Sequence, residues 1–222
     1  MPQLIQLIAE SRWSQGLSPS QIEFVRASMI ERVVPAGGNV VRKGEPVDHW
    51  IGVIEGIVKV HSVSADGKPM TFTGVPQGGW IGEGSMLKTE ARRYDIVAMR
   101  KSRIALMPRA TFNWLLDTSI GFNRFLLEQI NERLGQFLAL IEFERLLKPD
   151  AKIARCIASL FNPVLYPSSG LQLKISQEEI GFLAGISRQR VNQALQVLAT
   201  EKMLRVEYGG ITVLNLDGLK NY

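Results

Sequence analysis

The spacing of apolar residues changes twice along this chain of 222 residues, and these changes restrict its fold more than any other feature. From Val33 to Pro108, short β-rich runs alternate with glycine-containing turns, and Asp66-Gly67 between two runs is a hairpin signal. Many short strands with regular turns are typical of a sandwich or barrel. We therefore predict a β-roll or jelly roll here, preceded by short helices.

A helical pattern follows the β-rich part. Its apolar seam has members three and four residues apart, as in a coiled coil. The seam comprises Leu127, Ile130, Leu134, Phe137 and Ile141. Leu126 and Leu138 lie beside it, so one face of this helix can contact the β-roll and another can contact a second copy. We predict a symmetric homodimer through the five seam residues; packing of the seam on its own β-domain is the alternative.

The segment 176–198 predicts a helix-turn-helix. Ser176 and Glu179 have the spacing of a capping box, in which a hydroxyl and a carboxylate satisfy the first backbone N–H groups of a helix. Gly185 ends that helix, and Ser187 caps a second one. The next acidic residue after Glu179 is at position 201, so the second helix carries no negative charge.

The side chains at the start of the second helix suit the reading of DNA. Arginine can donate two hydrogen bonds to guanine, and glutamine or asparagine can pair with adenine. A hairpin around Gly209-Gly210 follows in the position of a wing. We predict double-stranded DNA as a partner, a solvated basic helix face being the alternative. The candidate DNA-contacting residues are Ser176, Gln177, Ser187, Arg188, Gln189, Arg190, Asn192 and Gln193.

Composition indicates where such a chain works. A hydrophobic fraction of 45% and a charged fraction of 21% are typical of a soluble globular protein, and the net charge of +5 permits a polyanionic partner. No run approaches the ~18 apolar residues of a membrane span. The N-terminus lacks a secretory pattern, and the lone Cys156 cannot form an internal disulfide. We expect a cytoplasmic protein with no membrane partner.

A second candidate site begins at Gly79-Trp80-Ile81-Gly82-Glu83, which is followed ten residues later by Arg93. A carboxylate can accept a sugar hydroxyl, and an arginine can bind a phosphate diester with help from backbone N–H groups of a glycine-rich turn. A surface salt bridge between Glu83 and Arg93 is the alternative, because two such residues at this spacing are common.

In the order of its parts the chain resembles the cyclic-AMP receptor protein/FNR (Crp-Fnr) family of bacterial transcription regulators. ISQEEIGFLAGISRQRVNQALQVL is similar to the family's DNA-binding signature, and GGWIGE…ARRYDIVA resembles its phosphate-binding cassette. The resemblance implies an α+β fold. Its parts would be a β-roll of the cyclic-nucleotide-binding type in residues 1–118, a dimerisation helix in 119–148, and a winged helix-turn-helix domain in 149–222.

The resemblance also implies a non-enzymatic, homodimeric regulator that binds an inverted-repeat operator and contacts RNA polymerase. Arg188 would contact a guanine beside Gln189 and Gln193, while Glu83 and Arg93 would hold the ribose and phosphate of a cyclic nucleotide. The implied ligand-binding residues are Gly82, Glu83, Gly84, Ser85, Arg92, Arg93, Tyr94, Asp95 and Phe137.

Two departures from the family pattern leave the effector open. Tyr94 and Asp95 follow Arg93, where cyclic-AMP binders usually have serine or threonine and a small residue. Phe137 and Leu138 stand where those proteins have a hydroxyl pair. The triplet 93–95 has the R-x-D form of some cyclic-di-GMP sites. Cyclic-di-GMP, cyclic AMP, another ligand and no ligand remain the alternatives.

Two further functions stay open at this point. One is a ligand-independent regulator whose β-roll only dimerises or contacts RNA polymerase. The other is a cupin-like metal enzyme, for which His49 and His61 are few ligands, and we predict no metal site. For a regulator, we expect an effector to move the long helix, rotate a joint at 147–150 and reset the spacing of the two recognition helices to about 34 Å.

Overall fold

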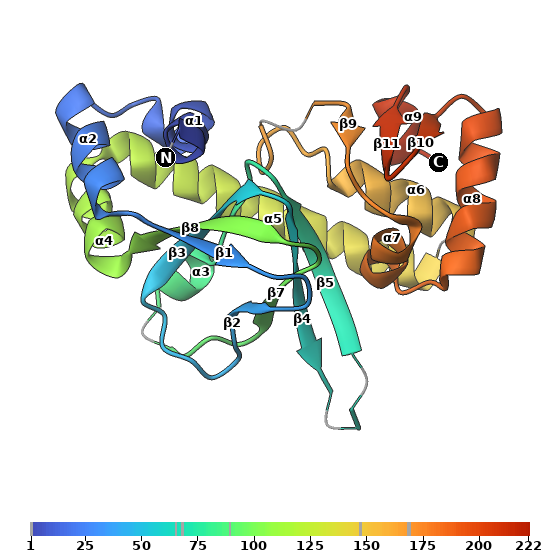
Figure 1. The fold of residues 1–222 in the computed structure, drawn as a ribbon, viewed down its shortest axis with the longest axis horizontal. Coiled ribbons are helices and arrows are strands. Elements are labelled where there is room, and N and C mark those ends of the chain that lie inside the picture. The colour runs from blue at the N-terminus through green and yellow to red at the C-terminus, as the bar shows by residue number, and fades with distance from the viewer. Residues whose placement is uncertain (1, 65, 68, 89, 147, 168–169) are drawn as a thin grey trace.

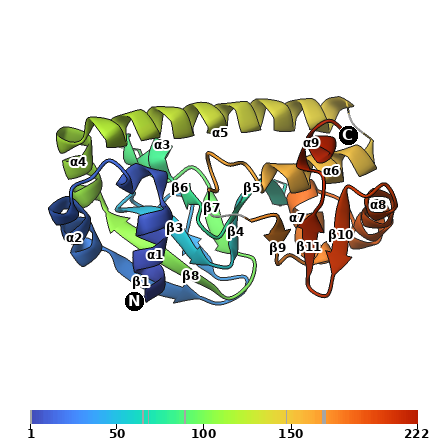
Figure 2. The ribbon, with the colours of Figure 1, turned by 90° about the horizontal axis from the view of Figure 1, so that it is seen from above.

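The long helix α5 (Ile120–Leu146) runs along the molecule and connects a β-rich N-terminal body to a mainly helical C-terminal body (Figure 1). The turned view shows α5 lying across both bodies (Figure 2). This computed structural model describes residues 2–64, 66–67, 69–88, 90–146, 148–167 and 170–222. The predicted α+β fold of β-roll, long helix and winged helix-turn-helix is confirmed.

The β-roll consists of two antiparallel four-stranded sheets. Their strand orders are β1-β8-β3-β6 and β2-β7-β4-β5. The strands are β1 (Ile30–Val34), β2 (Asn39–Val41), β3 (His49–Glu55), β4 (Ile57–Val63), β5 (Pro69–Pro76), β6 (Trp80–Ile81), β7 (Asp95–Ala98) and β8 (Ser102–Pro108). The predicted β4–β5 hairpin is present, with Gly67 at φ +80°; Ala65 and Lys68 of its turn lie outside the described residues.

Short helices cover one end of the roll. They are α1 (Pro2–Glu10), the 3-10 turn η1 (Arg12–Ser14), α2 (Pro19–Ser28), α3 (Glu83–Met86) and α4 (Arg109–Thr118). A buried cluster of aromatic rings joins them to α5, with Trp50 4.3 Å from Trp80 and 5.8 Å from Phe122 between ring centroids. Since rings packed this way bury much apolar surface, the cluster anchors the first half of α5 to the roll.

The C-terminal body is a winged helix. Its elements are α6 (Pro149–Ser159), β9 (Gln172–Leu173), α7 (Gln177–Ala184), α8 (Arg188–Thr200), β10 (Leu204–Glu207), β11 (Gly210–Val213) and α9 (Leu216–Lys220). Both halves of the predicted capping box at Ser176 and Glu179 form. Gly185 ends α7 in the left-handed conformation, at φ +66°, which glycine adopts without strain.

The predicted domain ranges 1–118, 119–148 and 149–222 stay a prediction. Met1 at their start and Leu147 in the expected joint lie outside the described residues. No helix in the described part of the chain is both long and apolar enough to span a membrane.

Candidate DNA-contacting and effector-binding sites

Four of the eight candidate DNA-contacting residues have structural roles in the helix-turn-helix. The hydroxyl of Ser176 accepts a hydrogen bond from the backbone N–H of Glu179 at 3.2 Å, and the hydroxyl of Ser187 accepts one from the N–H of Arg190 at 3.4 Å. The side-chain amide of Gln177 donates to Oδ1 of Asn192 at 3.0 Å, which links α7 to α8. These contacts hold the two helices in one orientation.

Arg190 is also held within the domain. Its guanidinium lies 3.0 Å from Asp150 of α6 and donates to Oε1 of Gln193 at 3.0 Å. Arg188 and Gln189 differ, because within the described part of the chain their exposed side chains make no hydrogen bond or ion pair. The first turn of α8 therefore presents one guanidinium and one amide to solvent, both free to bind base edges.

In the β-roll, Glu83 is buried at the start of α3 with only 4% of its surface exposed. Oε1 of Glu83 lies 3.5 Å from Nε of Arg133 on α5, while Oε2 has no hydrogen-bond partner among the described residues. Gly82 before it has φ +98°, a conformation that a side chain would strain. Gly82 and Glu83 are the buried residues of this turn, whereas Gly84 is exposed and Ser85 is half-buried.

Arg92, and not Arg93, reaches the interior beside this turn. Arg92 is 3% exposed and donates to the backbone carbonyl of His49 at 2.7 Å, and its Nε and Nη1 make no hydrogen bond within the described ranges of the chain. A Cβ on Gly82 would lie 3.3 Å from its Nη1. Burial lowers the pKa of Arg92, although Tyr94, Glu45 and Asp48 act against that effect. The alternative of a surface salt bridge between Glu83 and Arg93 is not what the structure shows, and the assignment of Arg93 to a ligand stays a prediction.

Arg92 and Arg93 lie in the segment before β7, which begins at Asp95, and their side chains differ in exposure. Arg93 is 69% exposed and pairs with Glu90, and Oδ1 of Asp95 accepts from the backbone N–H of Lys43 at 2.9 Å. Tyr94 packs against the core of the roll. The R-x-D triplet therefore does not face Glu83 as a unit.

Arg133 completes this buried cluster and was absent from the predicted residues. Its guanidinium is 8% exposed and donates to the Trp80 carbonyl at 2.9 Å and to the Tyr166 hydroxyl at 3.1 Å. Burial lowers the pKa of Arg133, but Tyr166 and Glu83 outweigh burial, so its pKa lies above the ordinary value. Phe137, the predicted ligand contact on α5, lies one turn further along and is half-buried.

A sequence signal for Arg133 exists in retrospect. The buried positions Phe122, Leu126, Gln129 and Arg133 of α5 are spaced four, three and four residues apart, which defines the face toward the roll. Gln129 and Arg133 are polar members of this otherwise apolar face, and both donate to the Trp80 carbonyl. Buried polar groups on an apolar face require partners, and such partners mark a polar site.

The predicted dimer seam lies on the outer face of α5. Its aliphatic members are exposed by 70% at Leu127, 37% at Ile130, 57% at Leu134 and 53% at Ile141. Phe137 is half-buried. These four aliphatic side chains are therefore not packed on the β-domain of their own chain, which was the alternative to a dimer. The dimer itself stays a prediction.

The sequence of the chain matches two protein-family descriptions. Residues 31–119 match the cyclic nucleotide-binding domain, and residues 151–222 match the Crp-like helix-turn-helix domain. The chain is 26% identical to the CRP-like cAMP-activated global transcriptional regulator of Mycobacterium tuberculosis over 218 residues, which cover 96% of this chain and 97% of that protein.

Solved structures show the same fold. FixK2 from Bradyrhizobium japonicum aligns with a TM-score of 0.69 at 17% identity, over 87% of this chain and 96% of that one. The c-di-GMP-responsive global regulator CLP from Xanthomonas campestris aligns with a TM-score of 0.60 at 22% identity, over 88% and 99%. In the described part of the chain, no group of three or more His, Cys, Asp or Glu side chains is placed to hold a metal ion.

Proposed function

Because the chain belongs to the Crp-Fnr family of bacterial transcription regulators, we propose that it is a cytoplasmic homodimer that binds an inverted-repeat operator under the control of an effector in its β-roll. The observation that carries the proposal is the first turn of α8. There Arg188 and Gln189 are exposed and make no side-chain hydrogen bond to any described residue, while Gln177 and Asn192 link α7 to α8 and Arg190 pairs with Asp150. This is the arrangement that base reading requires, since the reading groups must be unpaired and their helix rigid.

Dimerisation explains the outer face of α5. Four large aliphatic side chains, Leu127, Ile130, Leu134 and Ile141, lie in one exposed row, and burial against a second copy removes them from water. A twofold dimer presents two α8 helices, so the operator is an inverted repeat with half-sites about 34 Å apart, one turn of DNA. RNA polymerase is a further partner that we expect from the family alone.

The effector we propose is a cyclic nucleotide. Glu83 and Arg92 are buried together with unused hydrogen-bonding atoms, and these atoms suit a ribose hydroxyl and a phosphate diester. Arg93 pairs with Glu90 and Asp95 accepts from Lys43, so the R-x-D triplet does not favour cyclic-di-GMP over cyclic AMP. Both nucleotides are retained as alternatives. A regulator that works without ligand is the second candidate, favoured by the fact that Arg133 already pairs with Glu83.

Effector and DNA affinities are then coupled through two arrangements of the dimer. A ligand that binds one arrangement more tightly shifts the population toward it, and the coupling is reciprocal, typically about 1–3 kcal/mol.

Selection of DNA sequences by the full-length protein tests the first part. Random duplexes are enriched on the immobilised protein with and without cyclic AMP, cyclic GMP and cyclic-di-GMP, and the enriched sequences are aligned. We expect an inverted repeat that the Arg188→Ala variant fails to enrich. Enrichment of sequences without twofold symmetry would reject the dimeric reading, and nucleotide-independent enrichment would support the ligand-free regulator.

A further inference from the structure

Tyr166 belongs to the segment that follows α6, yet its side chain lies inside the β-roll. It is 1% exposed, and it shares a hydrophobic cluster with Leu165 and with residues of both sheets, such as Val58 and Ile81. Leu165 and Tyr166 come after α5 and α6 in the sequence, yet they complete the hydrophobic core of the β-roll. We call these two residues the Tyr166 plug.

The contacts of the Tyr166 plug place it at the effector site. The hydroxyl of Tyr166 donates to the carbonyl of Gly74 on β5 at 3.0 Å and accepts from Nη1 of Arg133 at 3.1 Å. A Cβ on Gly79, the first residue of the cassette, would lie 2.8 Å from the Tyr166 ring, so that glycine leaves room for the ring. Arg133 in turn lies 3.5 Å from Glu83.

The polar groups of this site are only partly satisfied in the plugged arrangement. Four buried atoms make no hydrogen bond to any residue that the structure describes: Oε2 of Glu83, Nε and Nη1 of Arg92, and Nε of Arg133. Burying charged atoms without partners is unfavourable, and a ligand with hydroxyl and phosphate oxygens supplies partners for them. The Arg133 guanidinium is shared among the Tyr166 hydroxyl, the Trp80 carbonyl and the Glu83 carboxylate.

A rigid turn connects the plug to the DNA-contacting body. The side-chain Oδ1 of Asn162 accepts hydrogen bonds from the backbone N–H groups of Val164 and Leu165, at 2.9 and 3.0 Å. The backbone carbonyl of Asn162 accepts a further one from the backbone N–H of Tyr166, at 2.8 Å. This turn directly follows α6, whose buried face packs into one cluster with α7 and α8. A displacement of Tyr166 is therefore passed to the helix-turn-helix.

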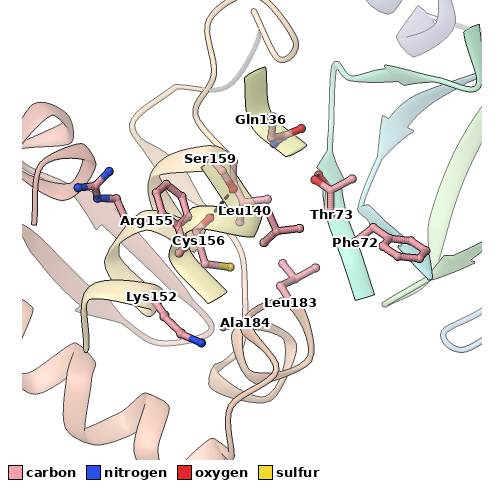
Figure 3. A pocket seen from close by; sticks show the side chains of 13 residues that line it. Phe72, Thr73, Gln136, Leu140, Lys152, Arg155, Cys156, Ser159, Leu183 and Ala184 are labelled. Carbon is pink, nitrogen blue, oxygen red and sulfur yellow. Dashed lines mark hydrogen bonds between the residues drawn. The ribbon is translucent and has the colours of Figure 1, made fainter. Parts of the chain in front are cut away.

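The C-terminal body also packs directly against β5. A Cβ on Gly74 would lie 3.0 Å from Leu160 of the α6 end and 3.0 Å from Leu183 of α7. Figure 3 shows Leu140 and Leu183 at the small cavity of about 40 Å³ that remains between β5, α5, α6 and α7. Gly74 thus contacts both the Tyr166 hydroxyl and the side chains of Leu160 and Leu183. Through this residue, the position of Tyr166 in the β-roll is linked to the packing of the C-terminal body on β5.

Building on the proposed function, we propose that the Tyr166 plug is an internal occupant of the effector site that holds the C-terminal body against the β-roll. A cyclic nucleotide that binds Glu83 and Arg92 competes with Tyr166 for Arg133 and for the space beside Gly79. Ligand entry expels the plug, and the turn at Asn162 transmits this movement to α7 and α8. Ligand binding and release of the plug are then a single event.

The test compares nucleotide and DNA binding of full-length variants. Tyr166→Phe removes the hydroxyl and keeps the ring, and Tyr166→Ala removes both. Phe112→Leu is the matched control, because Phe112 is a fully buried ring of the other hydrophobic cluster, with its centroid 5.3 Å from that of Phe122. Affinities for cyclic AMP, cyclic GMP and cyclic-di-GMP are measured by calorimetry, and affinity for the enriched operator by fluorescence anisotropy without nucleotide.

We expect Tyr166→Phe to bind the nucleotide at least fivefold more tightly than the unmodified chain, Tyr166→Ala more tightly still, and both to bind the operator more tightly without nucleotide. Phe112→Leu changes neither affinity. Unchanged or weaker nucleotide binding by folded Tyr166→Phe overturns the proposal. If Tyr166→Ala does not fold, amide exchange in the unmodified chain decides: residues 164–166 must exchange faster with saturating nucleotide, and unchanged or slower exchange overturns the plug.

The outcomes separate this proposal from the proposed function. Suppose that the chain enriches a symmetric operator, but neither the unmodified chain nor a Tyr166 variant binds any of the three nucleotides. This result overturns the proposal for the Tyr166 plug and leaves the proposed DNA binding intact. A chain in which Tyr166→Phe binds nucleotide more tightly while no symmetric operator is enriched supports the plug and rejects the regulator.

Discussion

Arg100, in the turn between β7 and β8, donates two hydrogen bonds to the carboxylate of Glu179 in the first turn of α7, the one from Nε spanning 2.9 Å. The pair joins the β-roll to the helix-turn-helix, and the same carboxylate accepts from the backbone N–H of Ser176 as part of the capping box. One side chain thus both begins α7 and attaches it to the other body. The Glu179 side chain is 10% exposed, so water compensates little for loss of its partner.

Arg100→Ala is therefore expected to lower the free energy of unfolding by about 1–3 kcal/mol, because a mostly buried carboxylate loses its charged donors. Arg103→Ala is the matched control, since Arg103 pairs with Glu31 inside the β-roll. Both variants lose an ion pair, but only Arg100→Ala should loosen the two bodies and raise the radius of gyration in small-angle scattering. An equal radius in both variants would show that the Arg100 pair does not hold the bodies together.

Arg188→Ala should weaken binding to the enriched operator by about 1–3 kcal/mol, the value of one bidentate base contact, with little effect on random DNA. Arg190→Ala is the comparison. Because the Arg190 guanidinium pairs with Asp150, we do not expect it to read a base. Arg190→Ala should therefore weaken binding to the operator and to random DNA by the same factor. Fluorescence anisotropy at fixed salt measures the four affinities. A loss on random DNA as large as that on the operator would contradict base reading by Arg188.

Leu134→Glu should convert the dimer to a monomer. Burial of a leucine contributes about 1.5–3 kcal/mol, and a dimer contains two copies, so the dissociation constant should rise by roughly 100-fold or more. Sedimentation velocity measures the change. Leu171→Glu is the control, because Leu171 is 53% exposed like Leu134 at 57% and does not belong to α5. A dimer that survives Leu134→Glu would exclude the seam as its interface.

Arg92→Ala should weaken nucleotide binding strongly, and Arg93→Ala should leave it nearly unchanged. Loss of charged hydrogen bonds to a phosphate costs about 1.5–3 kcal/mol or more, which is roughly 10-fold to 100-fold in affinity. The exposed Arg93 pairs with Glu90 and so cannot contribute comparably. Calorimetric titration decides. The reverse order of effects would restore the cassette assignment that the spacing of Glu83 and Arg93 suggests.

His49 should make stability depend on pH. Burial, with further effects from Arg92 and Arg32, lowers the pKa of His49 below 6.5 despite Asp48. The unfolded chain therefore binds this proton at a higher pH than the folded chain, and stability is complete above pH 6.5 and decreases as the pH falls through that value. Urea unfolding at pH 7.5 and 5.5 should show a smaller loss for His49→Gln. Parallel losses in both proteins would mean that His49 does not contribute.

Local patterns sufficed for much of this fold. The capping box at Ser176 and Glu179, the turn at Gly185 and the helix at 177–184 could be predicted because each depends on residues within one or two turns of helix. The seam of α5 was equally predictable, since residues three and four apart share a helix face whatever lies opposite. Hydrophobic period and turn chemistry are local properties of the chain, and they determined the order of the elements.

The effector site depended on contacts between distant residues. Arg92 and Arg93 are neighbours of the same type, and only the folded backbone of the segment before β7 decides which of the two side chains is buried. Arg133 and Tyr166 come from α5 and from the segment after α6, and no spacing in the sequence relates them to the cassette. The sequence by itself determined the elements and the exposed first turn of α8. Tertiary packing decided which buried polar groups meet, because that depends on how separate elements dock and not on their own periodicity.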